Sequence, residues 1–173
     1  GLGIDKYDLA GRVLLTEHEY FLLYNIYFPN GQKDETRLKY KLDFYDDLLP
    51  IINEQVESGS NVIVAGDWNT AHYPIDLARP KENVKTSGFM PIEREKLDDY
   101  VNDGWTDTFR LFNNEPEKYS WWSYRMGARA RNVGWRIDYF FVNSDFSDLC
   151  KNADIHQDVM GSDHCPVSLE LDL

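Results

Sequence analysis

Polar side chains that suit phosphate chemistry recur in this sequence at the ends of predicted strands. Four strand ends supply Tyr27 with Asn30, Asp67 with Asn69, Asp138, and Asp163 with His164. A cluster rich in acids with one histidine is a poor match to zinc, which usually takes several His or Cys ligands. It suits Mg²⁺ or Mn²⁺, because both ions prefer carboxylate oxygens and Mg²⁺ keeps several waters. The residue types therefore predict metal-assisted hydrolysis of a phosphate ester.

The histidine has a specific task in that reaction. One carboxylate would orient or deprotonate water, while His164 would neutralise charge on the transition state. Asp138 paired with one imidazole nitrogen would fix the tautomer and favour His164 as a cation. A Cys-His hydrolase using Cys165 is disfavoured, because adjacent residues of an extended chain point in opposite directions. Cys165 is expected instead to be a small buried apolar residue. The remaining histidines have no comparable context and are expected at the surface: His18, His72 and His156.

A buried strand is predicted to carry Asp67 and Asn69. Residues 61–65 form a short, continuous apolar run, which is typical of a strand covered on both faces. The run ends in Gly66-Asp67-Trp68-Asn69. Since Asp67 and Asn69 are two residues apart, their side chains would leave an extended backbone on the same side. A carboxylate and an amide at the end of a buried strand favour a functional site over a packing role.

Two further strands are predicted to hold the other acids and the histidine. Residues 136–142 return to an apolar, strand-like pattern with Asp138 near its start. Residues 168–173 alternate between polar and apolar side chains after the turn signal Gly161-Ser162. That turn delivers Asp163 and His164 to the mouth of the strand, where a sheet can hold them rigidly.

The remaining elements follow from periodicity and turn signals. Two apolar runs, 12–16 and 20–28, flank a polar Glu17-His18-Glu19 and predict a hairpin. A helix is expected from Asp34, and Pro50 should kink or divide it. Its predicted buried stripe is Leu38, Leu42, Tyr45, Leu49, Ile52 and Val56. The rest is predicted as a polar loop over 70–88, a helix over 91–101, and strands over 107–110 and 119–124.

Composition limits the classes of protein to which the chain can belong. Its 173 residues suit one domain, 1–173, with a sizeable core, and 42% of them are hydrophobic. The net charge of -12 excludes a generally basic nucleic-acid binder but permits a local basic patch. Cys150 and Cys165 are expected to be buried free thiols. With no membrane-spanning run and no signal peptide, we expect a cytoplasmic protein without membrane contacts, associated with the nucleoid in a bacterium.

One local stretch reverses the overall charge. Residues 125–136 contain four arginines and no acid, the most plausible phosphate footprint in this chain. The arginines are Arg125, Arg129, Arg131 and Arg136, and the nearby apolar residues are Trp121, Trp122, Met126 and Trp135. Flat or pliable apolar groups interleaved with arginine suit stacking on nucleotides or wedging between them. The alternative is a solvated basic loop beside core tryptophans. For Tyr27, the alternative is a core aromatic at a strand end.

Taken together, these motifs resemble the exonuclease III family of apurinic/apyrimidinic (AP) endonucleases. The matching runs are Tyr27-Phe-Pro-Asn-Gly31, Gly66-Asp-Trp-Asn69, Asn132-Val-Gly-Trp-Arg-Ile-Asp138 and Gly161-Ser-Asp-His-Cys-Pro166. The resemblance implies the α/β endonuclease/exonuclease/phosphatase fold, a two-sheet β-sandwich flanked by helices. It further implies a Mg²⁺-dependent AP endonuclease and 3′-5′ exonuclease of DNA base-excision repair. The substrate would be double-stranded DNA, cut 5′ to an abasic site or trimmed from 3′ ends.

The resemblance also implies a role for each matching residue. Asp67 would activate water or assist the leaving oxygen, and Asn69 and Tyr27 would bind the scissile phosphate. His164, oriented by Asp138, would act from the other side. The metal would lie near Asp163, Asp67 and Asn69. DNA contacts and the pocket for the extruded abasic sugar would come from Asn30, Asn83, Lys85, Trp121, Arg125, Met126, Arg129, Arg131, Trp135 and Ile137.

The chain departs from the family pattern at its N-terminus. Family members begin with a further strand-rich segment that carries the principal metal-ligand Glu, and no counterpart is found here. Glu17 and Glu19 lie in a predicted hairpin turn instead. We therefore expect weakened metal affinity and exposed apolar surface that pairs with a missing N-terminal segment or another chain. Two other functions stay open: a superfamily phosphoesterase acting on lipid or inositol phosphates, and a non-catalytic DNA-binding or assembly fragment.

Overall fold

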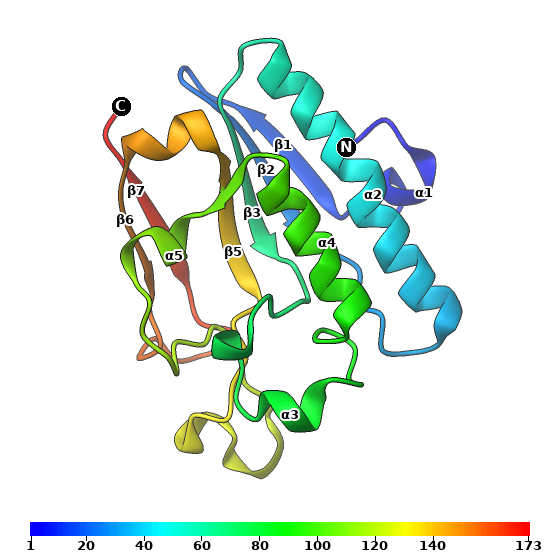
Figure 1. Ribbon diagram of the computed structural model, residues 1–173, viewed down its shortest axis with the longest axis vertical. Helices are drawn as coiled ribbons and strands as arrows, with labels where there is room; N and C mark the ends of the chain where they lie inside the picture. Colours follow the sequence, from blue (N-terminus) through cyan, green and yellow to red (C-terminus); the bar gives the residue numbers. More distant parts are fainter.

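A five-stranded mixed sheet forms the centre of the molecule (Figure 1). The computed structural model describes residues 1–173. The strands are β1 (Val13–Glu17), β2 (Leu22–Tyr27), β3 (Val62–Asp67), β4 (Trp105–Asp107) and β5 (Asp138–Asn143). They are arranged in the order β1-β2-β3-β5-β4, with β2 and β3 parallel and the other pairs antiparallel. The predicted hairpin is confirmed as β1 and β2, and the predicted central strand is β3.

Helices cover one face of this sheet and a second sheet covers part of the other (Figure 1). The helices on that face are α1 (Asp5–Asp8), α2 (Glu35–Glu57) and α4 (Pro91–Asn102), whereas α5 (Thr108–Phe112) packs against β6 and α3 (Pro80–Asn83) lies beyond the end of the sheet. Rings from α2 such as Phe44 and Tyr45 pack against Phe28, Trp68 and other aromatic residues of the main core. The second sheet pairs β6 (Cys150–Ile155) with β7 (Val167–Leu171) and packs over Ile63 and Val142. The expected two-sheet, helix-flanked fold is confirmed.

The long helix is confirmed, but its buried face and the effect of proline differ from the prediction. The Asp34 side chain caps α2 by accepting a hydrogen bond from the Arg37 amide. The fully buried positions are Lys41, Phe44, Tyr45, Leu48 and Ile52, so four of the six predicted stripe residues are only half-buried. The helix is not divided at Pro50, which is exposed. Water can therefore bind the carbonyl that this proline leaves without a donor.

Three local predictions were wrong. The strand expected at 107–110 is the end of β4 followed by α5, whose Phe109 is buried in a cluster with Ile155 and Cys165. Residues 119–124 form no strand, because Trp121 makes only isolated bridges to Trp135 and His164. Strand β6 was not predicted. Only Ala153 and Ile155 of its six residues are buried, so its apolar signal is weak.

Some apolar surface remains exposed, as expected. On the edge strand β1, Leu14 is 61% exposed and Leu15 is 38% exposed. An edge strand with exposed leucines is a template for pairing with another strand. No helix combines the length and apolarity that crossing a bilayer requires.

Candidate active site

Three of the predicted polar residues form one row across the sheet. Tyr27 pairs in register with Asp67, and Asp67 pairs with Asp138 on its other side. Directly paired residues project from the same face of a sheet. The three side chains therefore lie side by side at one edge of the sheet, where β2 and β3 end and β5 begins. Gly66 permits this register. It has φ +130°, and a Cβ there would lie 2.0 Å from the Ile26 carbonyl oxygen.

Asn69 folds back onto Asp67. The Asn69 amide N–H donates to Asp67 Oδ1 at 2.8 Å, and its Nδ2 donates to Asp67 Oδ2 at 3.1 Å and to the Phe28 carbonyl at 2.9 Å. The predicted proximity is correct, but its predicted cause is wrong. Asn69 has φ +52°, so the backbone is left-handed rather than extended, and the turn returns the amide to the carboxylate. Asn30 completes the arrangement by donating to Asn69 Oδ1 at 3.2 Å.

Asp138, the third member of this row, is hydrogen-bonded to His164. His164 Nδ1 donates to Asp138 Oδ2 at 2.9 Å. The His164 pKa is raised: burial lowers it, but the bond and charge of Asp138 outweigh burial. Ser120 also donates to Asp138 Oδ2, at 2.6 Å, and accepts the Ile137 and Asp138 amides. The contact with Asp138 therefore favours the protonated form of His164.

Asp67 has the most altered acidity of the site. Burial, followed by the nearby charge of Asp138, raises the pKa of Asp67 to about 7. A carboxylate that titrates near neutral pH can exchange a proton with water during a reaction, which is the property of a general base. Cys165 is not poised to react near neutral pH. Burial raises the pKa of its thiol to about 11, and its Sγ contacts the Tyr119 carbonyl at 3.7 Å. The Cys-His alternative therefore lacks a reactive thiolate.

Asp163 is tied to the tryptophan beside it. Trp121 Nε1 donates to Asp163 Oδ2 at 3.0 Å, and the Trp122 amide donates to the Asp163 carbonyl at 2.9 Å. The Asp163 pKa is lowered, since the Trp121 hydrogen bond and other contacts outweigh the effect of burial. These bonds fix the turn that carries His164.

These groups open into one pocket of about 730 Å³. Its walls include most of the predicted site: Tyr27, Asn30, Asp67, Asn69, Asn83, Trp121, Arg125, Met126, Arg131, Trp135, Ile137, Asp163 and His164. Trp121 and Trp135 meet edge to face, with centroids 6.5 Å apart and planes at 82°. Tyr27 is 54% exposed in the pocket, so its alternative as a core aromatic is wrong. The pocket thus joins the acidic row to an aromatic wall and a basic rim.

Two predicted DNA contacts lie elsewhere. Lys85 is exposed in a neighbouring shallow groove that also contains Gln32 and Leu38. Arg129 is half-buried, and its guanidinium lies 4.5 Å from the centre of the Trp122 ring. Its Nη atoms donate to the carbonyls of Gln157, Val159 and Ser162 at 3.0, 2.6 and 2.8 Å. Arg129 therefore clamps the turn that leads to Asp163 and His164.

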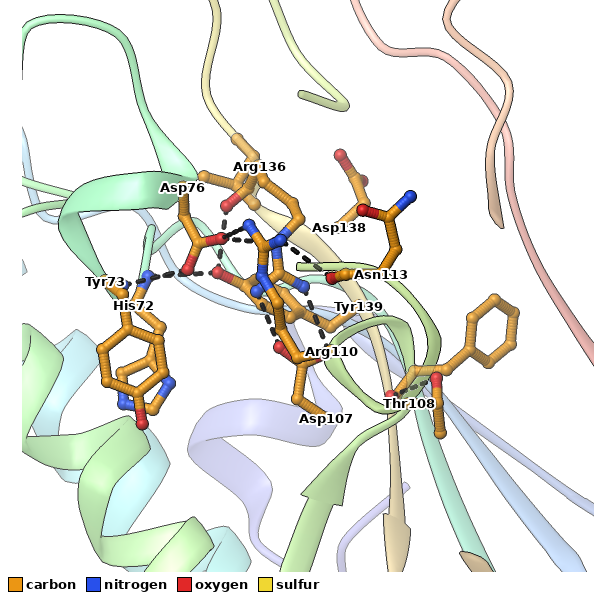
Figure 2. A network of polar contacts seen from close by, with 12 residues as sticks. His72, Tyr73, Asp76, Asp107, Thr108, Arg110, Asn113, Arg136, Asp138 and Tyr139 are labelled. Atoms are coloured by element: carbon orange, nitrogen blue, oxygen red, sulfur yellow. Dashed lines mark hydrogen bonds and ion pairs between the residues drawn. The ribbon is translucent and has the colours of Figure 1, made fainter. Parts of the chain in front are cut away.

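The fourth arginine of the basic stretch is also structural. Arg136 is fully buried and donates to Asp76 Oδ1 at 2.8 Å and to Asp107 Oδ2 at 2.6 Å (Figure 2). Arg110 pairs with the same Asp76, so the network joins the turn at 74–76 to β4 and to the segment that leads into β5. By contrast, Arg125 and Arg131 are exposed, and Met126 is 87% exposed. The phosphate footprint predicted for 125–136 is reduced to the exposed part of the loop.

His72 corrects another prediction. Expected at the surface, it is 1% exposed and its Nε2 lies 2.8 Å from Asp98 Oδ1. Burial lowers its pKa despite that contact. His18 is exposed as predicted and His156 is half-buried. Of the two thiols, Cys165 is buried and Cys150 is half-buried.

The sequence reasoning missed four residues near the site. Arg79 lines the pocket with φ +56°, and Ser120 is the second donor to Asp138. Lys41 and Glu93 form an ion pair beneath Asn69. A lysine amid the predicted apolar stripe of α2 and a Glu three residues after Met90 at the start of α4 were the available signals.

The donor set fits a hard cation held by few protein ligands. No group of three or more His, Cys, Asp or Glu residues converges in the structure. The carboxylates of Asp67 and Asp163 nevertheless line the same pocket, with the Asn69 side chain bonded to Asp67 through its amide nitrogen. Mg²⁺ is commonly bound through one or two carboxylates, with water and substrate phosphate completing its shell. The raised pKa of Asp67 beside Asp138 also marks an excess of negative charge that a cation would relieve.

Comparison with known proteins gives the class to which this sheet and site belong. A model of the endonuclease/exonuclease/phosphatase family matches residues 3–164, so the chain belongs to that family. Over its full length the chain is 41% identical to an exodeoxyribonuclease of Bacillus subtilis (strain 168) and spans 69% of it. It is 40% identical to a DNA-(apurinic or apyrimidinic site) endonuclease of Dictyostelium discoideum and spans 49% of that protein.

A solved structure agrees with both. The AP endonuclease from Archaeoglobus fulgidus superposes with a TM-score of 0.87 at 25% identity, covering 100% of this chain and 69% of that one. The predicted resemblance to exodeoxyribonucleases and AP endonucleases is confirmed. The chain is shorter than each of these relatives.

Proposed function

We propose that this chain hydrolyses phosphodiester bonds of damaged DNA, as an AP endonuclease and 3′-5′ exonuclease that depends on Mg²⁺ or Mn²⁺. The observation that carries the proposal is the union of two features in one pocket. A buried carboxylate of raised pKa, Asp67, lies beside the Asp138–His164 pair. In the same pocket, Trp121, Trp135 and Ile137 form an apolar wall. Such a pocket suits a sugar that carries no base, which costs little to extrude from the helix.

The reaction divides among the residues of the row. Asp67, titrating near neutral pH, takes a proton from the attacking water or supports the leaving oxygen. His164, whose protonated form Asp138 favours, donates hydrogen bonds to the phosphate and offsets the charge that develops on it. Asn69 and Tyr27 hold the phosphate from the other side of the pocket. When bound near Asp67, Asn69 and Asp163, the metal supplies Lewis-acid stabilisation of phosphate oxygens.

The rim accounts for DNA binding. Arg79, Arg125 and Arg131 surround the pocket and can contact the phosphates that flank the damaged nucleotide. Met126, almost fully exposed beside them, is suited to enter a groove and widen it. This arrangement favours DNA over the small head group of a lipid or an inositol phosphate.

The test is incision of a duplex with one abasic-site analogue, in Mg²⁺ and in chelator at fixed salt. Asp67→Asn, prepared identically, controls for contaminating nuclease. Metal-dependent incision that the variant lacks supports the proposal. Inositol and lipid phosphates serve as competing substrates, and turnover of these without DNA incision would overturn it.

A second candidate function is DNA binding without catalysis. The absence of any cluster of three metal-ligating side chains favours it. It predicts that abasic duplex binds, more weakly as salt rises, and is cut at no metal concentration.

A further inference from the structure

A fully buried ion pair lies beneath the pocket. Lys41 on α2 and Glu93 in the first turn of α4 are both 0% exposed, and Lys41 Nζ lies 2.6 Å from Glu93 Oε1. Burying two charges is unfavourable unless their remaining hydrogen-bonding groups are satisfied. The other partners of this pair therefore indicate what it holds.

Lys41 holds the backbone of Asn69. Its Nζ donates to the Asn69 carbonyl at 2.7 Å. Asn69 has φ +52°, a left-handed conformation that is unfavourable for a residue with a side chain. A charged donor on its carbonyl stabilises this turn, which returns the Asn69 amide groups to Asp67.

Glu93 holds the segment 87–90, part of which lines the pocket. Its Oε2 accepts the Gly88 amide at 2.6 Å and the Met90 amide at 3.2 Å, and its Oε1 accepts the Ser87 hydroxyl at 2.8 Å. Gly88 lies between Asn69 and Trp135. A Cβ at Gly88 would be 3.1 Å from the Asn69 carbonyl oxygen and 3.1 Å from Trp135 Cζ3. A displacement of Gly88 would therefore move the contact with Trp135.

We infer that Lys41 and Glu93 are a positioning pair that sets the spacing between Asn69 and Trp135. Neither Lys41 nor Glu93 lines the pocket itself. Lys41 fixes the residue that faces the phosphate, Glu93 fixes the loop against the tryptophan, and their ion pair joins the two. The catalytic consequence rests on the proposed function, whereas the geometric consequence does not.

The geometric part is tested by NMR without DNA or metal. Lys41→Met and Glu93→Gln remove one charge each at similar volume, and Lys41→Met/Glu93→Gln removes both. Lys39→Met is the matched control, because Lys39 lies on the same helix and is 73% exposed. We expect the Asn69 and Gly88 amide signals to move in Lys41→Met and in Glu93→Gln, and to stay in place in Lys39→Met.

The catalytic part is tested by kinetics of abasic-site incision. Displacement of Asn69 in Lys41→Met should lower kcat by about 10²-fold, since misplacement by about 1 Å has that effect. Glu93→Gln should raise KM as well, because it frees the loop against Trp135. The double variant should lose less than the product of the single losses, since the two changes disrupt one unit.

The outcomes separate the two ideas. If both single variants melt at lower temperature but keep the Asn69 and Gly88 signals of the native protein, the pair only stabilises the fold and the inference is overturned. If Lys41→Met moves Asn69 alone, the link to the Trp135 wall is overturned. If the native protein cuts no DNA, the proposed function fails, and the NMR comparison still decides whether the pair positions Asn69 and Gly88.

Discussion

The two sides of the pocket are built in different ways. The acidic side comes from adjacent positions of β2, β3 and β5, where strand register and hydrogen bonds fix Tyr27, Asp67 and Asp138. The basic side comes from a loop whose outermost residues, Arg125 and Met126, are exposed. In the proposed function, most groups that meet the phosphate are fixed by strands or by hydrogen-bonded turns, whereas groups that adapt to DNA lie on an exposed loop. Changes on the first side should therefore impair chemistry, and changes on the second should impair binding.

Asp67→Asn tests the acidic side most strongly. Loss of the proton acceptor should lower incision by about 10²–10⁴-fold, the usual range for general acid–base groups. DNA affinity, measured by fluorescence anisotropy in chelator, should change little. An equal loss of affinity would show that the two sides are not separate.

Asp76→Asn tests the scaffold beneath the acidic side. Removing one partner of the buried pair with Arg136 should lower the free energy of unfolding by about 3–5 kcal/mol. Urea unfolding at pH 7 measures this loss, and Lys118→Met, at a half-buried residue of a surface ion pair, should change it by less than about 1 kcal/mol.

The same carboxylate predicts a pH dependence. Burial raises the Asp76 pKa, but Arg136 and Arg110 outweigh burial and lower it overall. Its stabilising effect is therefore complete above the unfolded pKa of about 3.9 and is lost as pH falls through the lower folded pKa. Native protein should lose stability below about pH 4 more steeply than Asp76→Asn. Parallel curves for the two proteins would contradict this assignment.

Arg129 and Arg131 offer a matched pair on the basic side. Arg131→Ala should weaken binding of abasic duplex by about tenfold and reduce the salt slope by about 1, because one phosphate contact is lost. Arg129→Ala should instead lower the melting temperature, since three turn carbonyls lose their donor. A large salt-slope change in Arg129→Ala with unchanged melting would assign Arg129 to DNA after all.

Leu14→Lys lies on neither side and should leave incision unchanged. Leu14 is an exposed apolar residue on the edge strand β1, so a charge there should reduce self-association without altering the pocket. Sedimentation velocity of both proteins across a concentration series measures the effect. If the native protein and Leu14→Lys associate equally, β1 is not the edge through which the chain pairs.

The acidic side was more predictable from sequence than its supports. Asp67 ends an apolar run, Asp138 begins one and His164 follows a turn signal, so strand ends alone suggested their proximity. The left-handed turn at Asn69 could not be foreseen, because it depends on Lys41 from a distant helix. Likewise, nothing local distinguishes the clamping Arg129 from the free Arg131. Their roles depend on which carbonyls fold beside them.

Long-range burial also explains the misassigned elements. The 119–124 run is aromatic because Trp121 packs and hydrogen-bonds in the pocket wall and Trp122 does so in a buried cluster, not because it belongs to a ladder. Strand β6 escaped notice because only two of its six residues are buried. Arg136 was included in the predicted phosphate footprint because its buried acidic partners, Asp76 and Asp107, are 60 and 29 residues away.

The arginine clamp has a consequence for enzymatic digestion. Arg125 and Arg131 are exposed in a loop of short turns and are open to trypsin, whereas Arg129 between them is held by three carbonyls and a tryptophan ring. Partial digestion should therefore nick this loop at two of its three arginines. Because the clamp ties the loop to the 157–162 turn, the nicked fragments should stay together until denatured.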